Sequence, residues 1–461
     1  MRQLLLRSFA LLFTTILFSQ SGHIMQGVGA VNMSMGGAAT GQPLDVSGAL
    51  QWNPAALSNF DENILKLDVG LFFSSPELFS TVPELDMSGM PTGNFLSGNT
   101  EDDRGTSILP NLAYVWSNEG SKHTFGASAF GISGFGVTFP ESMTNPINAS
   151  QSMGGFGRIE SDYILLQIGF SWAYEISDKF SVGIQPNFNY ATLELAPNPL
   201  SAPSMTLGYP TSDKASATGF GAQIGLFYDS GSGFKAGASY KTTQTFSELD
   251  FKNTYLDGSA APDVSFQMDY PAILSLGLGY STGDVDLALD YRMVNYENTE
   301  GFEASGWTIA QSGPTQGFPT GAVNGFGWEN IDIISAGVQY KGIDKLPLRV
   351  GYTYSSNPIN DQLAFFSIPA TAINKNAFQF GLSYEASDNF NIDAVYHYGS
   401  SGDATSGPVL NPIPQAFGGP WDATTNPLGI IPSSEVSYEM KTSMVMFGLS
   451  YTFNKKQTDD N

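Results

Sequence analysis

Cysteine is absent from this chain of 461 residues. Its absence excludes disulfide bonds, thiolate nucleophiles and cysteine-based zinc sites. The three histidines, His23, His123 and His397, are far apart and show no spacing typical of a metal site. The sequence also has no Gly-x-Ser-x-Gly nucleophile elbow and no phosphate-binding loop. We therefore expect no metal, no cofactor and no enzymatic activity.

Charged residues are scarce, at 13% of the chain, where soluble domains have about 25%. The 19 basic residues are outnumbered by 43 acidic ones, which gives a formal net charge of −24. This balance argues against nucleic-acid binding, because no basic patch could neutralise phosphates. The acidic surplus is expected in solvated loops.

Long hydrophobic runs are missing, apart from residues 9–18 near the start of the chain. This run follows Arg2 and Arg7 and precedes small and polar residues, which is the arrangement of a secretory signal peptide. We assign the signal to residues 1–21. The run is too short to cross a bilayer, so the mature chain is predicted to have no transmembrane helix. A membrane role would require strands.

Glycine and aromatic residues are abundant, with 51 Gly, 33 Phe and 20 Tyr. From Ile64 onward, apolar residues recur at every second position, which is typical of strands with one apolar face. The opposite faces are small or polar, as at Gln167, Gly169 and Ser171. The clearest strands are predicted at 164–174, 220–228, 274–280, 346–354, 378–384, 390–398 and 445–453.

Such strands could form a soluble sandwich or a membrane barrel, and two features favour the barrel. Aromatic residues recur at strand ends, as an interfacial girdle requires; they include Tyr174, Tyr228, Tyr280, Tyr340, Tyr384 and Tyr451. Short connections also alternate with long ones, which lie near 78–105, 140–158, 194–215, 252–262, 303–325, 356–374 and 400–433. The short turns would face the periplasm and the long loops the exterior.

The predicted fold class is therefore all-β, a transmembrane antiparallel up-and-down barrel of about fourteen strands. Residues 22–61 are rich in glycine and lack alternation, so they are not expected to form strands. We assign the barrel to residues 62–453. Residues 454–461 are predicted to be a polar tail.

Several motifs resemble the FadL/TodX family of outer-membrane transporters of fatty acids and aromatic hydrocarbons. The resemblance covers nearly all the mature chain; its motifs are residues 22–30, Asp45, Asn53-Pro54-Ala55, Pro110-Asn111, Gly131-Ile-Ser-Gly-Phe-Gly136, Phe180-Ser-Val-Gly183, Gly219-Phe-Gly221, Tyr240-Lys241, Pro271, Arg349-Val-Gly-Tyr352, Asn357-Pro358 and Phe453. It implies an outer-membrane location in a Gram-negative bacterium and a barrel closed by an N-terminal hatch, residues 22–61. It also implies passive uptake of a hydrophobic ligand, captured at the outer loops and released sideways at a kinked third strand.

The resemblance assigns a hatch motif to Asn53, Pro54 and Ala55. Pro54 fixes its own φ and biases Asn53 away from helix, so a rigid turn is predicted on physical grounds alone. The alternative is a simple turn that leads into the first strand.

Gly131, Ser133, Gly134 and Gly136 belong to a strand with three glycines in six residues. Glycine weakens a strand and permits a bulge or a bend. The resemblance makes this the lateral gate, and an ordinary bulged strand or an extracellular turn is the alternative.

Met25, Val28, Met33 and Met35 are candidates for a hydrophobic ligand pocket, because methionine is flexible and polarizable. They could equally fill gaps between the hatch and the wall.

Strand alternation directs several charges into the lumen: Lys235, Lys241, Asp286, Asp290, Arg292 and Arg349. A cation there would suit a fatty carboxylate. For Asp290 with Arg292, a network that braces the interior is the favoured interpretation.

The sequence departs from the fatty-acid transporters at 191–195 and 328–332, which are acidic where the family is basic. A neutral hydrocarbon is therefore as plausible a cargo as a fatty acid.

Other expected partners are outer-membrane lipids and the barrel-insertion machinery, which would recognise the strand ending at Phe453. The barrel is expected to be monomeric. A structural or adhesive barrel and a polar-solute porin are the alternatives.

Overall fold

The computed structural model describes residues 22–86, 89–118, 120–303 and 305–453. The predicted signal peptide, residues 1–21, and the polar tail, residues 454–461, lie outside this range. Within it, no helix is long and apolar enough to span a membrane.

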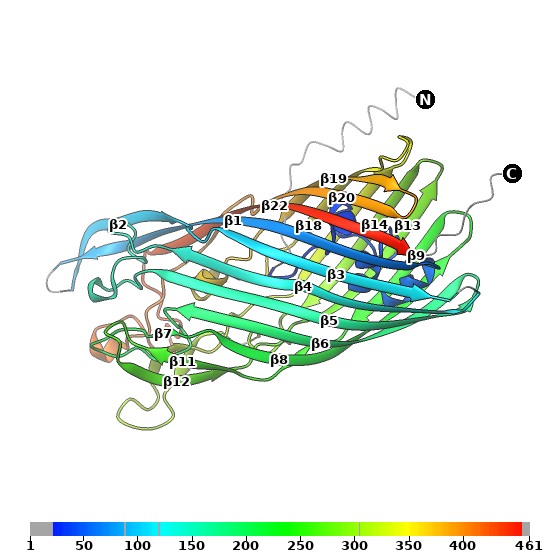
Figure 1. Ribbon diagram of the computed structural model, residues 1–461. Helices are drawn as coiled ribbons and strands as arrows, with labels where there is room; N and C mark the ends of the chain where they lie inside the picture. Colours follow the sequence, from blue (N-terminus) through cyan, green and yellow to red (C-terminus); the bar gives the residue numbers. More distant parts are fainter. Residues whose placement is uncertain (1–21, 87–88, 119, 304, 454–461) are drawn as a thin grey trace.

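The described strands form a closed antiparallel barrel of 14 strands, which confirms the predicted fold class (Figure 1). The first and last strands close it through a continuous ladder that runs from Asn63 opposite Phe453 to Thr81 opposite Glu435. In order, the strands are β1 (Asn63–Leu85), β2 (Pro91–Glu101) continued by β3 (Thr106–Ser117), β4 (His123–Phe139), β5 (Ile159–Ser177), β6 (Phe180–Ala196), β8 (Ala215–Asp229), β9 (Phe234–Lys241), β13 (Ala272–Thr282), β14 (Val285–Asn295), β17 (Ile331–Tyr340), β18 (Leu348–Ser355), β19 (Asn376–Ser387), β20 (Phe390–Ser400) and β22 (Glu435–Phe453).

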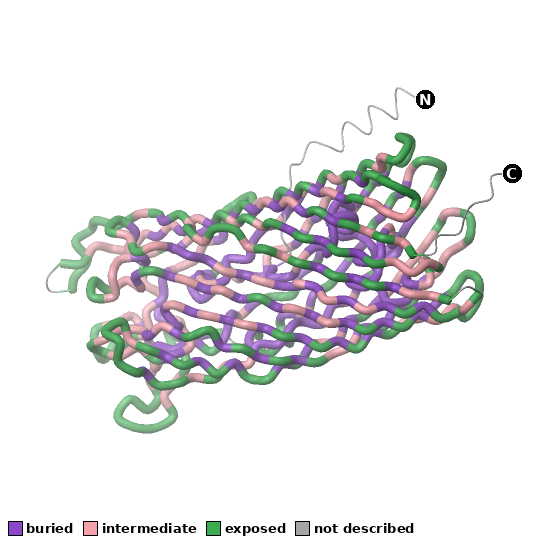
Figure 2. The backbone as a smooth tube through the Cα atoms, viewed as in Figure 1, coloured by how far each residue is buried: buried purple, intermediate pink, exposed green. Residues whose placement is uncertain are grey.

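The two faces of each strand differ as the alternation predicts. On β5, Ile164 and Phe170 point outward and are 47% and 59% exposed, while Gln167 and Ser171 on the other face are buried. The bands of buried and exposed residues alternate along the strands in Figure 2. A wall with an apolar exterior and a polar interior is suited to a lipid environment.

The N-terminal segment, residues 22–60, forms no wall strand and is almost entirely buried. It contains α2 (Ala30–Ser34), α3 (Val46–Trp52) and the 3-10 helix η2 (Pro54–Asn59). Helix α2 contacts β18, β19, β20 and β22, α3 contacts β1, β3 and β4, and η2 contacts β4, β5, β6 and β8. The segment therefore touches inner faces around most of the barrel, and its helices are the blue coils among the strands in Figure 1.

Wall glycines allow this segment to lie directly against the strands. A Cβ at Gly237 would lie 1.8 Å from the carbonyl oxygen of Thr40, and one at Gly277 would lie 2.4 Å from the amide nitrogen of Gly41. Any side chain at these positions would collide with backbone, which explains part of the high glycine content.

The long connections contain short elements of their own. They are β7 (Thr211–Ser212), β10 (Thr245–Phe246), β11 (Leu249–Thr254), β12 (Ala260–Phe266), β15 (Trp307–Ile309), β16 (Pro319–Val323), β21 (Thr405–Gly407), η3 (Gln151–Met153), η4 (Asp361–Ala370) and η5 (Gln415–Phe417). The long connection predicted near 78–105 is mostly strand, because β1 and β2 extend as a paired hairpin through most of this range. Pro76 and Pro83 argue against a strand, because proline is disfavoured inside strands, yet β1 contains both of them.

We predict that Gly237→Ala destabilises the barrel by about 1–3 kcal/mol, since the added methyl group must displace the backbone at Thr40. Thermal unfolding followed by heat-modifiable migration in detergent would measure this. The matched control is Gly70→Ala, where the nearest atoms belong to the flexible side chains of Met446 and Met444. Equal stability of the two variants would contradict close packing of the segment against β9.

Candidate functional site

Strand β4 has a bulge where its ladder with β3 ends. The ladder runs from Ser117 opposite Thr124 to Asn111 opposite Phe130, and β4 then continues to Phe139 without β3 beside it. On its other side, β4 pairs with β5 throughout, with Ile132 as an extra residue between Gly131 and Ser133. This is a bulge at the position that the glycine pattern indicates.

The N-terminal segment occupies the edge of β4 that β3 has left. The amide of Met25 donates to the carbonyl of Ile132 at 3.0 Å. The carbonyl of His23 accepts from the amide of Gly134 at 3.1 Å and from the hydroxyl of Ser133 at 3.0 Å. Residues 23–25 therefore satisfy backbone groups that would otherwise face an interruption in the wall.

The connection between β2 and β3 borders this interruption at its outer end. The amide of Asp103 donates to the carbonyl of Thr138 at 2.8 Å. Arg104 crosses β4 to reach the Asp162 carboxylate on β5, and a Cβ at Gly136 would lie 1.1 Å from its guanidinium nitrogen. Gly136 thus provides room for this ion pair. We call the region between residues 104–110 and 131–137 the wall window.

The Asn53-Pro54-Ala55 motif is both a turn and a wall contact. The side-chain amide of Asn53 donates to the carbonyls of Thr40 at 2.9 Å and Leu226 at 3.0 Å. Its side-chain oxygen Oδ1 accepts from the backbone amide of Ala55, which caps helix η2. Pro54 is the first residue of that helix, a position that requires no amide donor.

Among the predicted lumen charges, Asp290 and Arg292 are brought together, 2.6 Å apart and fully buried. The same Asp290 oxygen accepts from the amides of Ala39 and Thr40, both at 2.9 Å. Arg292 donates to the carbonyl of Gly37 at 2.7 Å, and its guanidinium lies 3.7 Å from the centre of the Trp52 ring. This pair therefore binds the N-terminal segment to the wall.

The other predicted lumen cations are separate from that pair. Arg349 donates to Gln339 at 2.6 Å, and Lys241 donates to Gln167 at 3.1 Å, both in buried positions. Lys235 is half-buried and donates to Asn59 at the end of the N-terminal segment.

A second buried ionic cluster was missed by the sequence reasoning. Lys66 lies 2.8 Å from Asp393, 3.0 Å from Asp45 and 4.0 Å from Asp68. Asp68 also accepts from the amide of Ala30 at 2.9 Å. The alternation of β1 contained the signal, because outward-facing leucines flank Lys66 and so direct it into the lumen.

The candidate ligand residues Met25, Val28, Met33 and Met35 do not converge on one pocket. Met33, with Met25 beside it, packs against wall residues Val395, Met444 and Met446. Met35 packs with Ala38 and Ala288, and Val28 belongs to the large apolar core. All four contribute to the packing between the segment and the wall.

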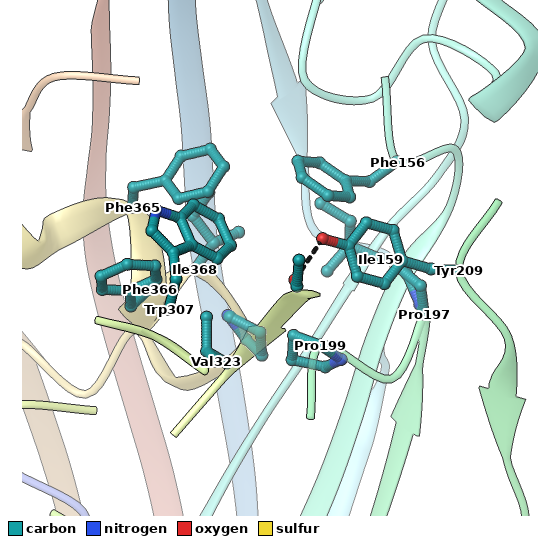
Figure 3. A pocket seen from close by; sticks show the side chains of 12 residues that line it. Phe156, Ile159, Pro197, Pro199, Tyr209, Trp307, Val323, Phe365, Phe366 and Ile368 are labelled. Atoms are coloured by element: carbon teal, nitrogen blue, oxygen red, sulfur yellow. Dashed lines mark hydrogen bonds between the residues drawn. The ribbon is translucent and has the colours of Figure 1, made fainter. Parts of the chain in front are cut away.

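An apolar pocket lies instead among the long connections (Figure 3). It has a volume of about 490 Å³, including its open mouth. The aromatic rings in Figure 3 face a common space, and none of the residues that line it is charged; they are Phe156, Ile159, Pro197, Pro199, Tyr209, Trp307, Gly321, Val323, Phe365, Phe366, Ile368 and Pro369. Such a lining suits an apolar solute. No sequence pattern indicates this pocket, because its lining comes from four separate connections and from Ile159, the first residue of β5.

No group of three or more metal-ligating acidic or histidine side chains occurs in the part of the chain that the structure describes.

The comparisons with known proteins agree with this architecture. The model of a family described as outer membrane protein transport protein (OMPP1/FadL/TodX) matches residues 17–454. The chain resembles the toluene transporter TodX of P. putida with 18% identity and a TM-score of 0.64, covering 94% of this chain and 100% of that one. It resembles a FadL homologue of Pseudomonas aeruginosa with 16% identity and a TM-score of 0.66, over 94% and 100% of the chains.

A third similar structure is the toluene transporter TbuX of Ralstonia pickettii. It has 17% identity and a TM-score of 0.59, over 93% and 99% of the two chains. At these identities the structural likeness shows the fold alone. No curated protein sequence matches.

We predict that Lys66→Met costs about 3–5 kcal/mol of stability, because it leaves three buried carboxylates without their cation. Urea unfolding in lipid vesicles, followed by tryptophan fluorescence, would measure the loss. As control, Lys252→Met breaks an ion pair with Asp263 that is largely exposed and should cost at most about 1 kcal/mol. If both variants unfold alike, the buried cluster does not hold the segment.

Proposed function

The chain belongs to the OMPP1/FadL/TodX family of outer membrane transport proteins, and on this premise we propose that it is a passive channel for hydrophobic compounds, with lateral release through the wall window. The protein lies in the outer membrane of a Gram-negative bacterium. The observation that carries the proposal is the interrupted ladder at Asn111 and Phe130, where residues 23–25 replace a wall strand.

Capture would begin at the apolar pocket among the outer connections. Burying the apolar surface of a solute there is favourable by about 25 cal/mol per Å². The pocket could therefore concentrate a sparingly soluble compound at the cell surface without an energy source.

The N-terminal segment would act as a hatch that closes the barrel to polar solutes. It is fastened to the wall at three points: the amide of Ala30 donates to Asp68, the amide of Ala39 donates to Asp290, and the side-chain amide of Asn53 donates to the carbonyl of Leu226. Residues 22–25 precede all of these fastenings along the chain. We infer that this end moves while the rest of the hatch stays in place.

Withdrawal of residues 23–25 would break their bonds to β4 and uncover the wall window. A solute could then leave directly into the hydrocarbon layer, where an apolar compound is more stable than in the aqueous periplasm. The cargo is a hydrophobic small molecule, either a fatty acid or a hydrocarbon. Two of the similar structures are named as toluene transporters, which is consistent with a hydrocarbon.

The barrel would also interact with other components of the outer membrane. The apolar exterior of the wall would contact outer-membrane lipids, and the last strand would be read by the barrel-insertion machinery. The single barrel is complete through its β1–β22 ladder, which supports a monomer.

Deletion of Ile132 should abolish uptake of toluene while the barrel still assembles. Removing the extra residue restores a regular β4, so the strand can continue its pairing with β3 and close the window. Uptake of radiolabelled toluene by cells that express the variant would measure the loss. Ile132→Ala keeps the bulge and is the matched control. Normal uptake by the deletion variant would exclude lateral release and favour a structural barrel or another exit.

Phe156→Ala should slow uptake several-fold at low toluene concentration and have little effect at saturation. The substitution removes apolar surface from the capture pocket without altering the window. The control is Phe417→Ala, which truncates an exposed aromatic residue in a different connection. A large, steady conductance of the wild-type protein in planar bilayers would instead indicate a polar-solute porin.

A further inference from the structure

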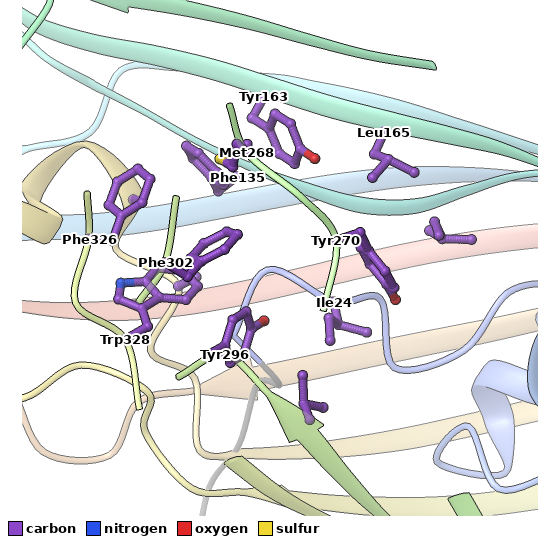
Figure 4. Packing of buried hydrophobic residues seen from close by; sticks show 14 of the residues in the cluster. Ile24, Phe135, Tyr163, Leu165, Met268, Tyr270, Tyr296, Phe302, Phe326 and Trp328 are labelled. Atoms are coloured by element: carbon purple, nitrogen blue, oxygen red, sulfur yellow. The ribbon is translucent and has the colours of Figure 1, made fainter. Parts of the chain in front are cut away.

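His23 lies in a cluster of six aromatic rings at the inner side of the wall window. The distances from its ring centroid to the others range from 4.9 Å, to Phe302, to 6.4 Å, to Phe135. The other four rings are those of Tyr163, Tyr270, Tyr296 and Trp328. The rings of Tyr163, Tyr270, Tyr296 and Phe302 face a common centre in Figure 4.

The polar atoms in this cluster are not all satisfied. Nδ1 of His23 and the Tyr296 hydroxyl form a hydrogen bond of 2.7 Å. Nε2 of His23 and the hydroxyl of Tyr163 are buried and have no hydrogen-bond partner among the described residues. By contrast, the indole of Trp328 donates to Ser367. Two unpartnered polar atoms in one apolar cluster are costly, at about 1–3 kcal/mol each.

We propose that this ring cluster is a ligand seat for an uncharged monoaromatic compound that carries one hydrogen-bonding group, such as a phenol, and that His23 occupies the seat in the closed state. The inference rests on the proposed channel function. An imidazole is a flat ring with a hydrogen-bonding atom on its edge, so it has the shape and chemistry of such a ligand. The contacts of the His23 ring therefore indicate which kind of ligand the seat would bind.

The hydroxyls of Tyr163 and Tyr296 would determine the choice of ligand. When His23 withdraws, the Tyr296 hydroxyl loses its partner, and the Tyr163 hydroxyl already has none among the described residues. A phenolic hydroxyl can bond to either of them, whereas a plain hydrocarbon leaves both unpaired. A site with buried polar groups rejects the analogue that lacks the matching group.

Charge sets a second limit on the ligand. None of the six residues around the His23 ring is charged, so an anion would be buried without a direct counter-ion. The ammonium group of Lys241 lies 5.9 Å from the Tyr270 ring centre, but it is a neighbour of that ring and donates to Gln167. We therefore expect phenol to bind more tightly than benzoate.

Calorimetric titration of the full-length barrel in detergent with phenol, toluene and benzoate would test the seat. The dissociation constant for phenol should be at least about fivefold lower than for toluene, the discrimination expected from one buried hydrogen bond. Tyr296→Phe and Tyr163→Phe should each reduce that ratio, and the double variant should bring it close to one. His23→Ala should bind phenol more tightly than the wild type, and it should also bind added imidazole.

Tyr438→Phe is the matched control, since Tyr438 is also fully buried but donates to Ala364 in another part of the interior. It should keep the wild-type ratio. Heat-modifiable migration would verify that each variant is folded.

Three outcomes would overturn the seat. They are equal binding of phenol and toluene by the wild type, a ratio that persists in the double variant, and tighter binding of benzoate than of phenol. An ordered water that bridges His23 and Tyr163, together with equal binding, would identify a hydration site only. Toluene uptake by cells separates the two proposals. Uptake without selective binding of phenol would support the channel and contradict the seat. Selective binding of phenol without uptake would support the seat and contradict the channel.

Discussion

The structure depends on the need to satisfy backbone polar groups inside a barrel that a non-strand segment fills. Residues 22–60 are buried, so each amide and carbonyl must find a partner away from bulk water. The wall supplies those partners from inward-facing side chains. Asp68 accepts from Ala30, and Asp290 accepts from two successive amides of the segment. A purely apolar lumen could not hold this segment.

This constraint explains two features of composition. Carboxylates are stable in the lumen where a buried cation lies beside them, as in the Lys66 and Arg292 clusters. Glycines recur on inward-facing positions because the backbone of the segment approaches the wall within contact distance, as at Gly237 and Gly277. The segment can therefore lie only where the glycines and carboxylates of the wall match its backbone, and this determines its position in the barrel.

Much of the barrel was predictable, because the period of two directly reports which face of a strand is apolar. The bulge of β4 was also visible, since Gly131, Gly134 and Gly136 interrupt an otherwise regular strand. The ring cluster was not predicted, because Tyr270, Tyr296 and Trp328 lie outside or at the ends of the alternating segments. One signal was available: around Tyr163, the run Tyr-Ile-Leu-Leu is apolar on both faces, which indicates packing on the inner side as well.

The buried charges also bear on the cargo. Lys66 and Arg292 are already paired with wall carboxylates and engaged with the N-terminal segment, so a ligand carboxylate would have to compete with existing ion pairs. Arg349 and Lys241 donate instead to neutral side-chain amides, those of Gln339 and Gln167. These amides would compete with a ligand carboxylate less strongly than a paired carboxylate does. Neither residue lines the apolar pocket or contacts the ring of His23. Residues of the pocket lining and of the ring cluster belong to one buried apolar core, so desolvation there penalises an anion far more than a neutral ring.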